Sequence, residues 1–208
     1  MPSGFQLYYI TDRSQLVSET LEARIGAAIA AGVDWVQIRE KDLPVRRLFT
    51  MVESAVECAR QLGHARVMVN DRLDVGLAVK AHGVHLGTRS LPVEVVRKLA
   101  PPEFFVGASC HSLEESLAAQ AAGADYILLG PIFATPSKLP YGAPLGIEKF
   151  REAALRVSIP IFALGGITIE HVPACLRNGA AGIAGIRLFQ ECDSVEALVR
   201  ELRASATR

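Results

Sequence analysis

The chain has 208 residues, half of them hydrophobic, and its 22 basic and 22 acidic side chains give a formal net charge of zero. This length suits one domain with a substantial core, and the neutral balance argues against nucleic acid or an anionic membrane as the main partner. No apolar stretch approaches the roughly 20 residues that span a bilayer, and the first residues lack the pattern of a signal peptide. The four cysteines are scattered without metal-finger spacing, so we expect buried free thiols in a cytoplasmic protein.

Short apolar segments alternate with helical segments along the chain. The apolar segments have the continuous hydrophobic character of buried parallel strands. Strands are predicted at 6–10, 34–38, 65–69, 83–86, 104–108, 126–129, 159–164 and 181–186. Helices are predicted at 18–31, 44–62, 73–79, from 92 onward, 112–122, 147–156, 170–177 and 195–202. Eight such units favour the α/β class and a single (β/α)8 TIM barrel over an open doubly wound sheet, with residues 1–208 as one domain.

Polar residues follow almost every predicted strand. Each cluster alone has a structural explanation, such as a solvated loop, a helix cap or a buried histidine. The carboxyl ends of barrel strands form the active-site face, so we expect the clusters to lie together around one rim. The longest of these loops, 130–146, is rich in Gly and Pro and carries Thr135, Ser137 and Lys138. Long loops in compact domains are commonly functional, and this one has the groups to hold an anion.

The predicted rim has more cationic than anionic groups, and Asp71 is its clearest carboxylate. Two glycine-rich turns, 165–166 and 182–185, follow or overlap the last strands, where barrels commonly bind phosphate through backbone N–H groups. This chemistry suits a phosphorylated or diphosphorylated substrate with Mg²⁺ at Asp71. The sequence has no Ser-His-Asp order, P-loop or zinc motif. The rim cations are Arg39, Lys41, Arg72, Lys138 and Arg187.

The order of these motifs resembles the thiamine phosphate synthase/TenI superfamily, from Leu7 to Leu202. The matching stretches are YYITD at 8–12, VQIREKD at 36–42, VNDR at 69–72, GVHLG at 83–87, SCH at 109–111, TPSK at 135–138 and ALGGI at 163–167.

The resemblance implies a reaction and a set of site residues. In synthases of this family, hydroxymethylpyrimidine diphosphate loses pyrophosphate, and the nitrogen of thiazole phosphate captures the pyrimidinyl cation. The implied catalytic residues are Arg39, Lys41, Ser109, His111 and Lys138. The implied substrate contacts are Gln37, Asn70, Thr135, Ser137, Gly166, Ile186 and Arg187, and Asp71 is the implied Mg²⁺ ligand. The implied partners are these two small phosphorylated substrates, and a homo-oligomer is compatible with the fold.

Two positions depart from the synthase pattern. The family usually continues GVHLG as Gln-x-Asp, and that Asp is a second Mg²⁺ ligand, whereas this chain has Ser90 there. We expect the loss of the anionic ligand to weaken Mg²⁺ binding. In the last phosphate turn Arg187 replaces the usual Ser, and an arginine can pair with a phosphate through two parallel hydrogen bonds.

These departures leave other functions open. TenI-type proteins are thiazole tautomerases, and His111 would then move a proton on a thiazole carboxylate phosphate, because an imidazole can act as acid and base near neutral pH. A non-catalytic barrel that binds a thiamine precursor is a third reading. A phosphosugar isomerase would need a carboxylate base that the sequence does not identify. The retained Gln37, Arg39 and Asp71 favour the synthase.

Overall fold

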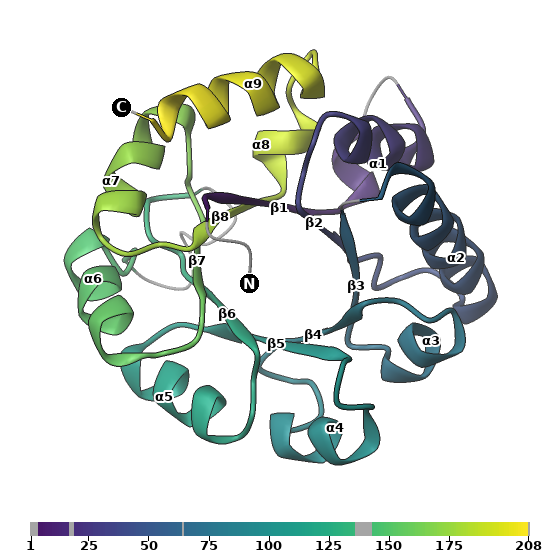
Figure 1. Ribbon diagram of the computed structural model, residues 1–208, viewed down its shortest axis with the longest axis horizontal. Helices are drawn as coiled ribbons and strands as arrows, with labels where there is room; N and C mark the ends of the chain where they lie inside the picture. Colours follow the sequence, from purple (N-terminus) through teal and green to yellow (C-terminus); the bar gives the residue numbers. More distant parts are fainter. Residues whose placement is uncertain (1–3, 17–18, 64, 136–142, 208) are drawn as a thin grey trace.

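The computed structural model describes residues 4–16, 19–63, 65–135 and 143–207. Its eight parallel strands close into a barrel in sequence order, with the last strand paired to the first. The strands are β1 (Gln6–Ile10), β2 (Trp35–Ile38), β3 (Arg66–Asn70), β4 (Gly83–Leu86), β5 (Phe105–Cys110), β6 (Tyr126–Leu129), β7 (Ile161–Leu164) and β8 (Gly182–Gly185). Figure 1 looks along the barrel, with the strands as the inner ring and the helices outside. The predicted (β/α)8 TIM barrel is confirmed.

The helices cover the outside of the strands. In the described part of the chain they are α1 (Leu21–Ala30), α2 (Val45–Leu62), α3 (Leu73–Ala78), α4 (Val93–Leu99), α5 (Leu113–Ala121), α6 (Ile147–Arg156), α7 (Val172–Arg177), α8 (Arg187–Gln190) and α9 (Val195–Ser205), with the short 3-10 helices η1 (Arg13–Gln15) and η3 (Ile169–His171). The predicted bounds differ from these by at most three residues, and η1 and α8 were not predicted. None of the helices in the described ranges combines the length and the apolar character needed to span a membrane.

Large aromatic side chains fill the inside of the barrel. Tyr8, Trp35, Tyr126 and Phe162 are fully buried there, and their rings contact one another. Gly107 on the neighbouring strand β5 leaves room for the Tyr126 ring, because a Cβ atom at Gly107 would overlap this ring. The barrel interior is therefore a packed core, and a ligand site must lie at an end of the barrel.

We expect two glycine-to-alanine substitutions to have opposite effects on stability. Gly26 lies inside α1, and a Cβ atom there would meet nothing within 4 Å, so Gly26→Ala should raise the unfolding free energy by about 0.5–1 kcal/mol. Gly107→Ala should lower it by about 1–3 kcal/mol, because the added methyl displaces the buried Tyr126 ring. Urea unfolding followed by circular dichroism measures both, and a destabilised Gly26→Ala would contradict the open space at that position.

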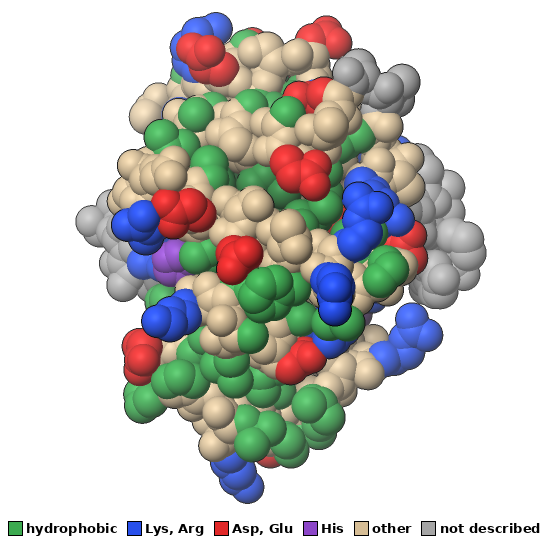
Figure 2. Space-filling view, turned by 90° about the vertical axis from the view of Figure 1, so that its right-hand side faces the viewer, with side chains coloured by type: hydrophobic (Ala, Val, Ile, Leu, Met, Phe, Trp, Pro, Cys, Tyr) green, Lys and Arg blue, Asp and Glu red, His purple; other side chains and the backbone are tan. Residues whose placement is uncertain are grey.

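The outer surface mixes charged and apolar side chains. On the side of the barrel seen in Figure 2, acidic and basic groups alternate, and apolar side chains gather in the lower part. Large exposed apolar side chains occur at Leu77 in α3, at Val95 and Leu99 in α4, and at Leu91 before α4. A homo-oligomer stays a prediction, because the structure contains one chain. All four cysteines are free, as expected, but two of them are buried and two are only partly buried.

Candidate active site

A cavity of about 750 Å³ lies at the carboxyl ends of the strands. Every predicted site residue in the described part of the chain lines it, and together they come from the ends or following loops of β2 to β8. These residues are Gln37, Arg39, Lys41, Asn70, Asp71, Ser90, Ser109, His111, Thr135, Gly166, Ile186 and Arg187. Ser137 and Lys138, the other two predicted residues, lie outside the described residues. The rim predicted from the strand ends is thus a single site.

Asp71 and Ser90 form one corner of the cavity. The Ser90 hydroxyl contacts Oδ1 of Asp71 and accepts a hydrogen bond from the Gly87 N–H at 2.7 Å. The Asn70 amide donates to the other carboxylate oxygen at 2.7 Å. Asp71 has a φ of 61°, a conformation that non-glycine residues adopt mainly at turns and strained sites. This backbone is held by a 3.0 Å hydrogen bond from the Asp71 N–H to the His85 carbonyl, so the carboxylate is fixed toward Ser90.

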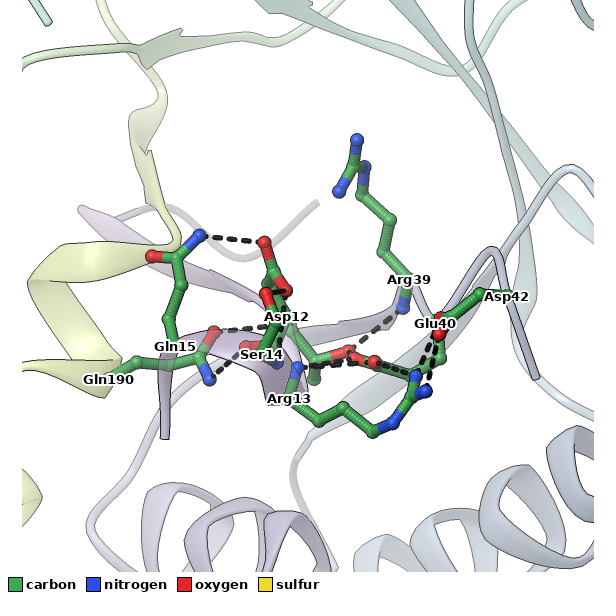
Figure 3. A network of polar contacts seen from close by, with 9 residues as sticks. Asp12, Arg13, Ser14, Gln15, Arg39, Glu40, Asp42 and Gln190 are labelled. Carbon is green, nitrogen blue, oxygen red and sulfur yellow. Dashed lines mark hydrogen bonds and ion pairs between the residues drawn. The ribbon is translucent and has the colours of Figure 1, made fainter. Parts of the chain in front are cut away.

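Glu40 joins the loops that follow β1 and β2 (Figure 3). Its buried carboxylate accepts a 2.6 Å hydrogen bond from the Thr11 hydroxyl and one of 3.1 Å from the Arg13 N–H. The Arg13 guanidinium adds an ion pair at 3.1 Å. Thr11 Oγ1 in turn accepts a hydrogen bond from the Arg39 N–H at 2.9 Å. In Figure 3 the Arg39 side chain extends away from this network, and it lines the cavity, so Glu40 holds the backbone that carries Arg39.

The loops after β6 and β7 lie against each other at the opposite side of the cavity. Gly166 has a φ of 66°, and a Cβ atom there would lie 2.5 Å from the Ala134 carbonyl oxygen and 2.7 Å from that of Phe133. The Phe133 ring stacks on His171 with 3.7 Å between ring centroids. Glycine is therefore needed at 166 to let the two backbones meet, and both Gly165 and Gly166 line the cavity.

The short helix α8 begins at the cavity. Its first residues, Arg187 and Leu188, line the cavity, and their N–H groups have no acceptor within the helix because they occupy its first turn. The Arg187 guanidinium lies 3.5 Å from Thr135 Oγ1 and 3.9 Å from the Glu191 carboxylate. Arg187 and Thr135 therefore meet across the gap between the loops after β6 and β8.

His111 lies at the exposed rim after β5. Its side chain is 40% exposed, and its Nδ1 lies 3.2 Å from a carboxylate oxygen of Glu115. Ser112 caps α5, because its side chain accepts from the Glu115 N–H. The Glu115 side chain in turn accepts from the His111 N–H at 2.7 Å, so Glu115 holds both the backbone and the ring of His111.

The floor of the cavity contains a residue to which the sequence reasoning gave no role. His85 in β4 is 2% exposed, and its Nε2 lies 2.8 Å from the Ser109 hydroxyl. Burial lowers the pKa of His85 to about 3, so its imidazole is neutral at physiological pH. The signal for it was its place in the GVHLG motif, inside an otherwise apolar strand.

Three predicted rim features differ in the structure. Arg72 pairs with Asp74 at 2.5 Å and does not line the cavity, whereas Arg89 does. Only the end of the 182–185 turn reaches the site: Gly185 lines the cavity, and Gly182 packs beside Gln6 and Phe162 inside the barrel. Asp71 was the one carboxylate singled out for the rim, whereas Asp12 also lines the cavity.

Known proteins resemble this chain along nearly its whole length. A family model described as thiamine monophosphate synthase matches residues 7–189. The thiamine-phosphate synthase of Chloroflexus aurantiacus is 42% identical over 202 residues, which cover 96% of this chain and 92% of that protein. The thiamine-phosphate synthase of Methanoculleus marisnigri is 40% identical over 200 residues, covering 96% and 94%.

A solved structure agrees with these relatives. The thiamine phosphate pyrophosphorylase from Pyrococcus furiosus superposes with a TM-score of 0.88 at 34% identity, and the match covers 98% of this chain and 96% of that one. The match to the family model, the similar proteins and the solved structure agree, and the chain therefore belongs to the thiamine monophosphate synthase family.

Proposed function

We propose that this protein is an enzyme that joins hydroxymethylpyrimidine diphosphate to thiazole phosphate, with release of pyrophosphate. The observation that carries the proposal is the cavity itself, which gathers the predicted diphosphate, metal and phosphate residues from β2 to β8 around one space. The family membership of the chain supports the same reaction. A cytoplasmic location stays a prediction.

The Asp71 corner fits a magnesium ion. No group of three or more His, Cys, Asp or Glu side chains that could hold a metal occurs among the described residues, so these residues do not form a closed metal cage. Mg²⁺ is commonly held by one or two carboxylates together with substrate phosphates, and it prefers oxygen ligands. Asp71 and the Ser90 hydroxyl supply two such oxygens side by side. When bound there, Mg²⁺ would offset the charge that develops on the departing pyrophosphate.

The side chains of the cavity have distinct parts in the proposed reaction. The carbon–oxygen bond to the diphosphate breaks and its electron pair leaves with pyrophosphate; the thiazole nitrogen then forms the new bond to the carbon. Arg39, Lys41 and Ser109 would bind the leaving group, where fixed donors stabilise developing negative charge. Thr135 and Arg187 lie together at the other side of the cavity, and would bind the phosphate of the thiazole substrate. The nitrogen carries no proton to remove, so the reaction needs no strong general base.

The test is a direct assay. Purified protein is incubated with hydroxymethylpyrimidine diphosphate, thiazole phosphate and Mg²⁺, and thiamine phosphate and pyrophosphate are measured together. We expect equal amounts of both products. No thiamine phosphate, together with tautomerisation of thiazole carboxylate phosphate that His111→Ala abolishes, would overturn the synthase proposal.

One observation favours the tautomerase as a second candidate. His111 and Glu115 form a histidine–carboxylate pair at the rim, with 3.2 Å between Nδ1 and the carboxylate oxygen. Such a carboxylate can orient an imidazole that gives and takes a proton. The same assay separates the two functions, because the synthase reaction does not need His111 for proton transfer.

We expect Ser90→Asp to lower the Mg²⁺ concentration for half-maximal synthase activity by about tenfold. The new carboxylate would lie beside Asp71, where Ser90 now contacts Oδ1, and two carboxylates bind Mg²⁺ more strongly than one. A Mg²⁺ titration of the initial rate measures this effect. Ser90→Asn is the matched control. Asparagine has the shape of aspartate without its charge, so this variant should not lower the Mg²⁺ concentration for half-maximal activity. An equal or higher requirement in Ser90→Asp would contradict the geometry of this corner.

A further inference from the structure

A row of five polar side chains crosses the barrel beneath the cavity. Gln37 Nε2 lies 3.1 Å from the Tyr8 hydroxyl, which lies 2.8 Å from the Tyr126 hydroxyl. The Tyr126 hydroxyl lies 3.2 Å from Nδ1 of His85, and Nε2 of His85 lies 2.8 Å from the Ser109 hydroxyl. Gln37, His85 and Ser109 line the cavity, whereas Tyr8 and Tyr126 lie below it. The row thus connects two predicted ligand contacts through the buried core.

The hydrogen bonds of this row have one direction. An amide nitrogen only donates, so Tyr8 accepts from Gln37, and its own proton goes to Tyr126. Tyr126 then donates to Nδ1 of His85, and the proton on Nε2 goes to Ser109. If Tyr126 donated to Tyr8 instead, the buried Tyr8 proton would have no acceptor among the described residues, which is costly.

We propose that Tyr8, Tyr126 and His85 are positioning residues whose one-way hydrogen bonds make Gln37 an acceptor and Ser109 a donor toward the ligand. Ser109 accepts from His85, so its own proton is free to point into the cavity. At the other end, the nitrogen of the Gln37 amide donates to the Tyr8 hydroxyl, which leaves the amide oxygen as the group that Gln37 can offer to a ligand. The inference rests on the proposed function for the identity of the ligand groups: an anionic oxygen at Ser109 and an amino group at Gln37.

Burial keeps this row in its neutral forms. Tyr8 and Tyr126 are 0% exposed, and burial raises the pKa of each hydroxyl above its usual value. His85 is 2% exposed, and its two ring nitrogens face the uncharged Tyr126 and Ser109 hydroxyls, so its ring contacts favour a neutral imidazole with one proton. No member gains or loses a charge at physiological pH, so the direction of the row is maintained without a counterion.

The first experiment determines the direction of the hydrogen bonds in the row without measuring catalysis. The protein is labelled with ¹⁵N-histidine, and the two ring nitrogens of His85 are examined by NMR near pH 7.5, with His85→Gln used to assign the signals. We expect Nε2 to carry the proton and Nδ1 to be bare. If the hydrogen bonds ran in the opposite direction, the Gln37 amide would be rotated so that its oxygen faces Tyr8, and Nδ1 of His85 would carry the proton. An Nδ1–H tautomer in the wild type would therefore overturn the proposal.

The second experiment removes single hydroxyl groups. Tyr126→Phe keeps the ring but takes away the donor to His85 Nδ1. We expect a mixed tautomer, pyrophosphate binding in the presence of Mg²⁺ weakened about five- to tenfold, and a kcat lowered by a similar factor, with the KM for thiazole phosphate unchanged. Tyr8→Phe leaves the Tyr126–His85 bond in place, so we expect the His85 tautomer to be kept and the KM for the pyrimidine diphosphate to rise.

Tyr9→Phe is the matched control. Tyr9 is the next residue of β1 and also 0% exposed, and its hydroxyl has no hydrogen-bond partner in the described part of the chain. We expect this variant to keep the tautomer, the pyrophosphate affinity and the rate of the wild type. If Tyr126→Phe behaves like Tyr9→Phe, the positioning role is wrong. If the tautomer and pyrophosphate results hold but no thiamine phosphate forms, the proposed function fails and the hydrogen-bond row stands.

Discussion

Arg39→Ala is expected to lower kcat/KM for the synthase reaction by about 10²–10³-fold, the usual cost of removing a fixed group that stabilises developing charge. Arg39 is held at the end of β2 through its N–H and extends into the cavity, on the side opposite the network that anchors its backbone (Figure 3). The departing pyrophosphate gains negative charge there in the proposed reaction. Steady-state kinetics with both substrates measure the loss, which we expect mainly in kcat.

Two variants test whether the Arg39 effect is specific. Arg39→Lys keeps the charge but loses the planar pair of donors, so we expect it to recover only part of the rate. Arg72→Ala removes a nearby arginine that pairs with Asp74 and does not line the cavity, and its rate should stay within about twofold of the wild type. If Arg39→Ala is no worse than Arg72→Ala, Arg39 has no special part in the reaction.

The barrel and most of the candidate site could be predicted from local patterns. Continuous apolar strands such as Tyr126–Leu129 alternate with helices, and the carboxyl ends of parallel strands converge on one face. That rule places Asn70, Ser109 and Arg187 together, although they are far apart in the sequence. The resemblance to a known family assigned their roles, which composition and spacing alone do not.

What the sequence could not predict depends on register and on single backbone angles. Tyr8 and Tyr126 are 118 positions apart, and only the closed barrel brings their hydroxyls within hydrogen-bond distance. α8 has four residues, too few for a helical period to be visible. Arg72 follows Asp71, whose positive φ redirects the chain, and a local ion pair then holds the Arg72 side chain away from the cavity. Such details follow from tertiary packing and not from residue type.

Glu40→Ala is expected to destabilise the protein by about 2–4 kcal/mol and to lower its melting temperature by about 5–15 °C. The buried carboxylate is the acceptor for the Thr11 hydroxyl and for the backbone and guanidinium of Arg13 (Figure 3). Its removal takes this acceptor from the Thr11 hydroxyl and the Arg13 N–H, whereas the guanidinium keeps its pair with Asp42. We also expect a loss of activity, because Thr11 Oγ1 orients the Arg39 backbone. Urea unfolding and kinetics on the same preparation measure the two effects.

Asp42→Ala and Thr11→Val separate the two effects of Glu40. Asp42 pairs with the same arginine, but its side chain is 73% exposed, so its removal should cost less than about 1 kcal/mol. Thr11→Val preserves the shape of the side chain and removes only the hydroxyl between Glu40 and the Arg39 N–H, so we expect a lower kcat with most of the charge network intact. Equal stability losses in Glu40→Ala and Asp42→Ala would show that the buried carboxylate does not organise this rim. Glu40 is buried, whereas Asp42 is exposed. Comparing the stability and the activity of the two variants therefore tests whether the buried or the exposed carboxylate holds Arg39 in position.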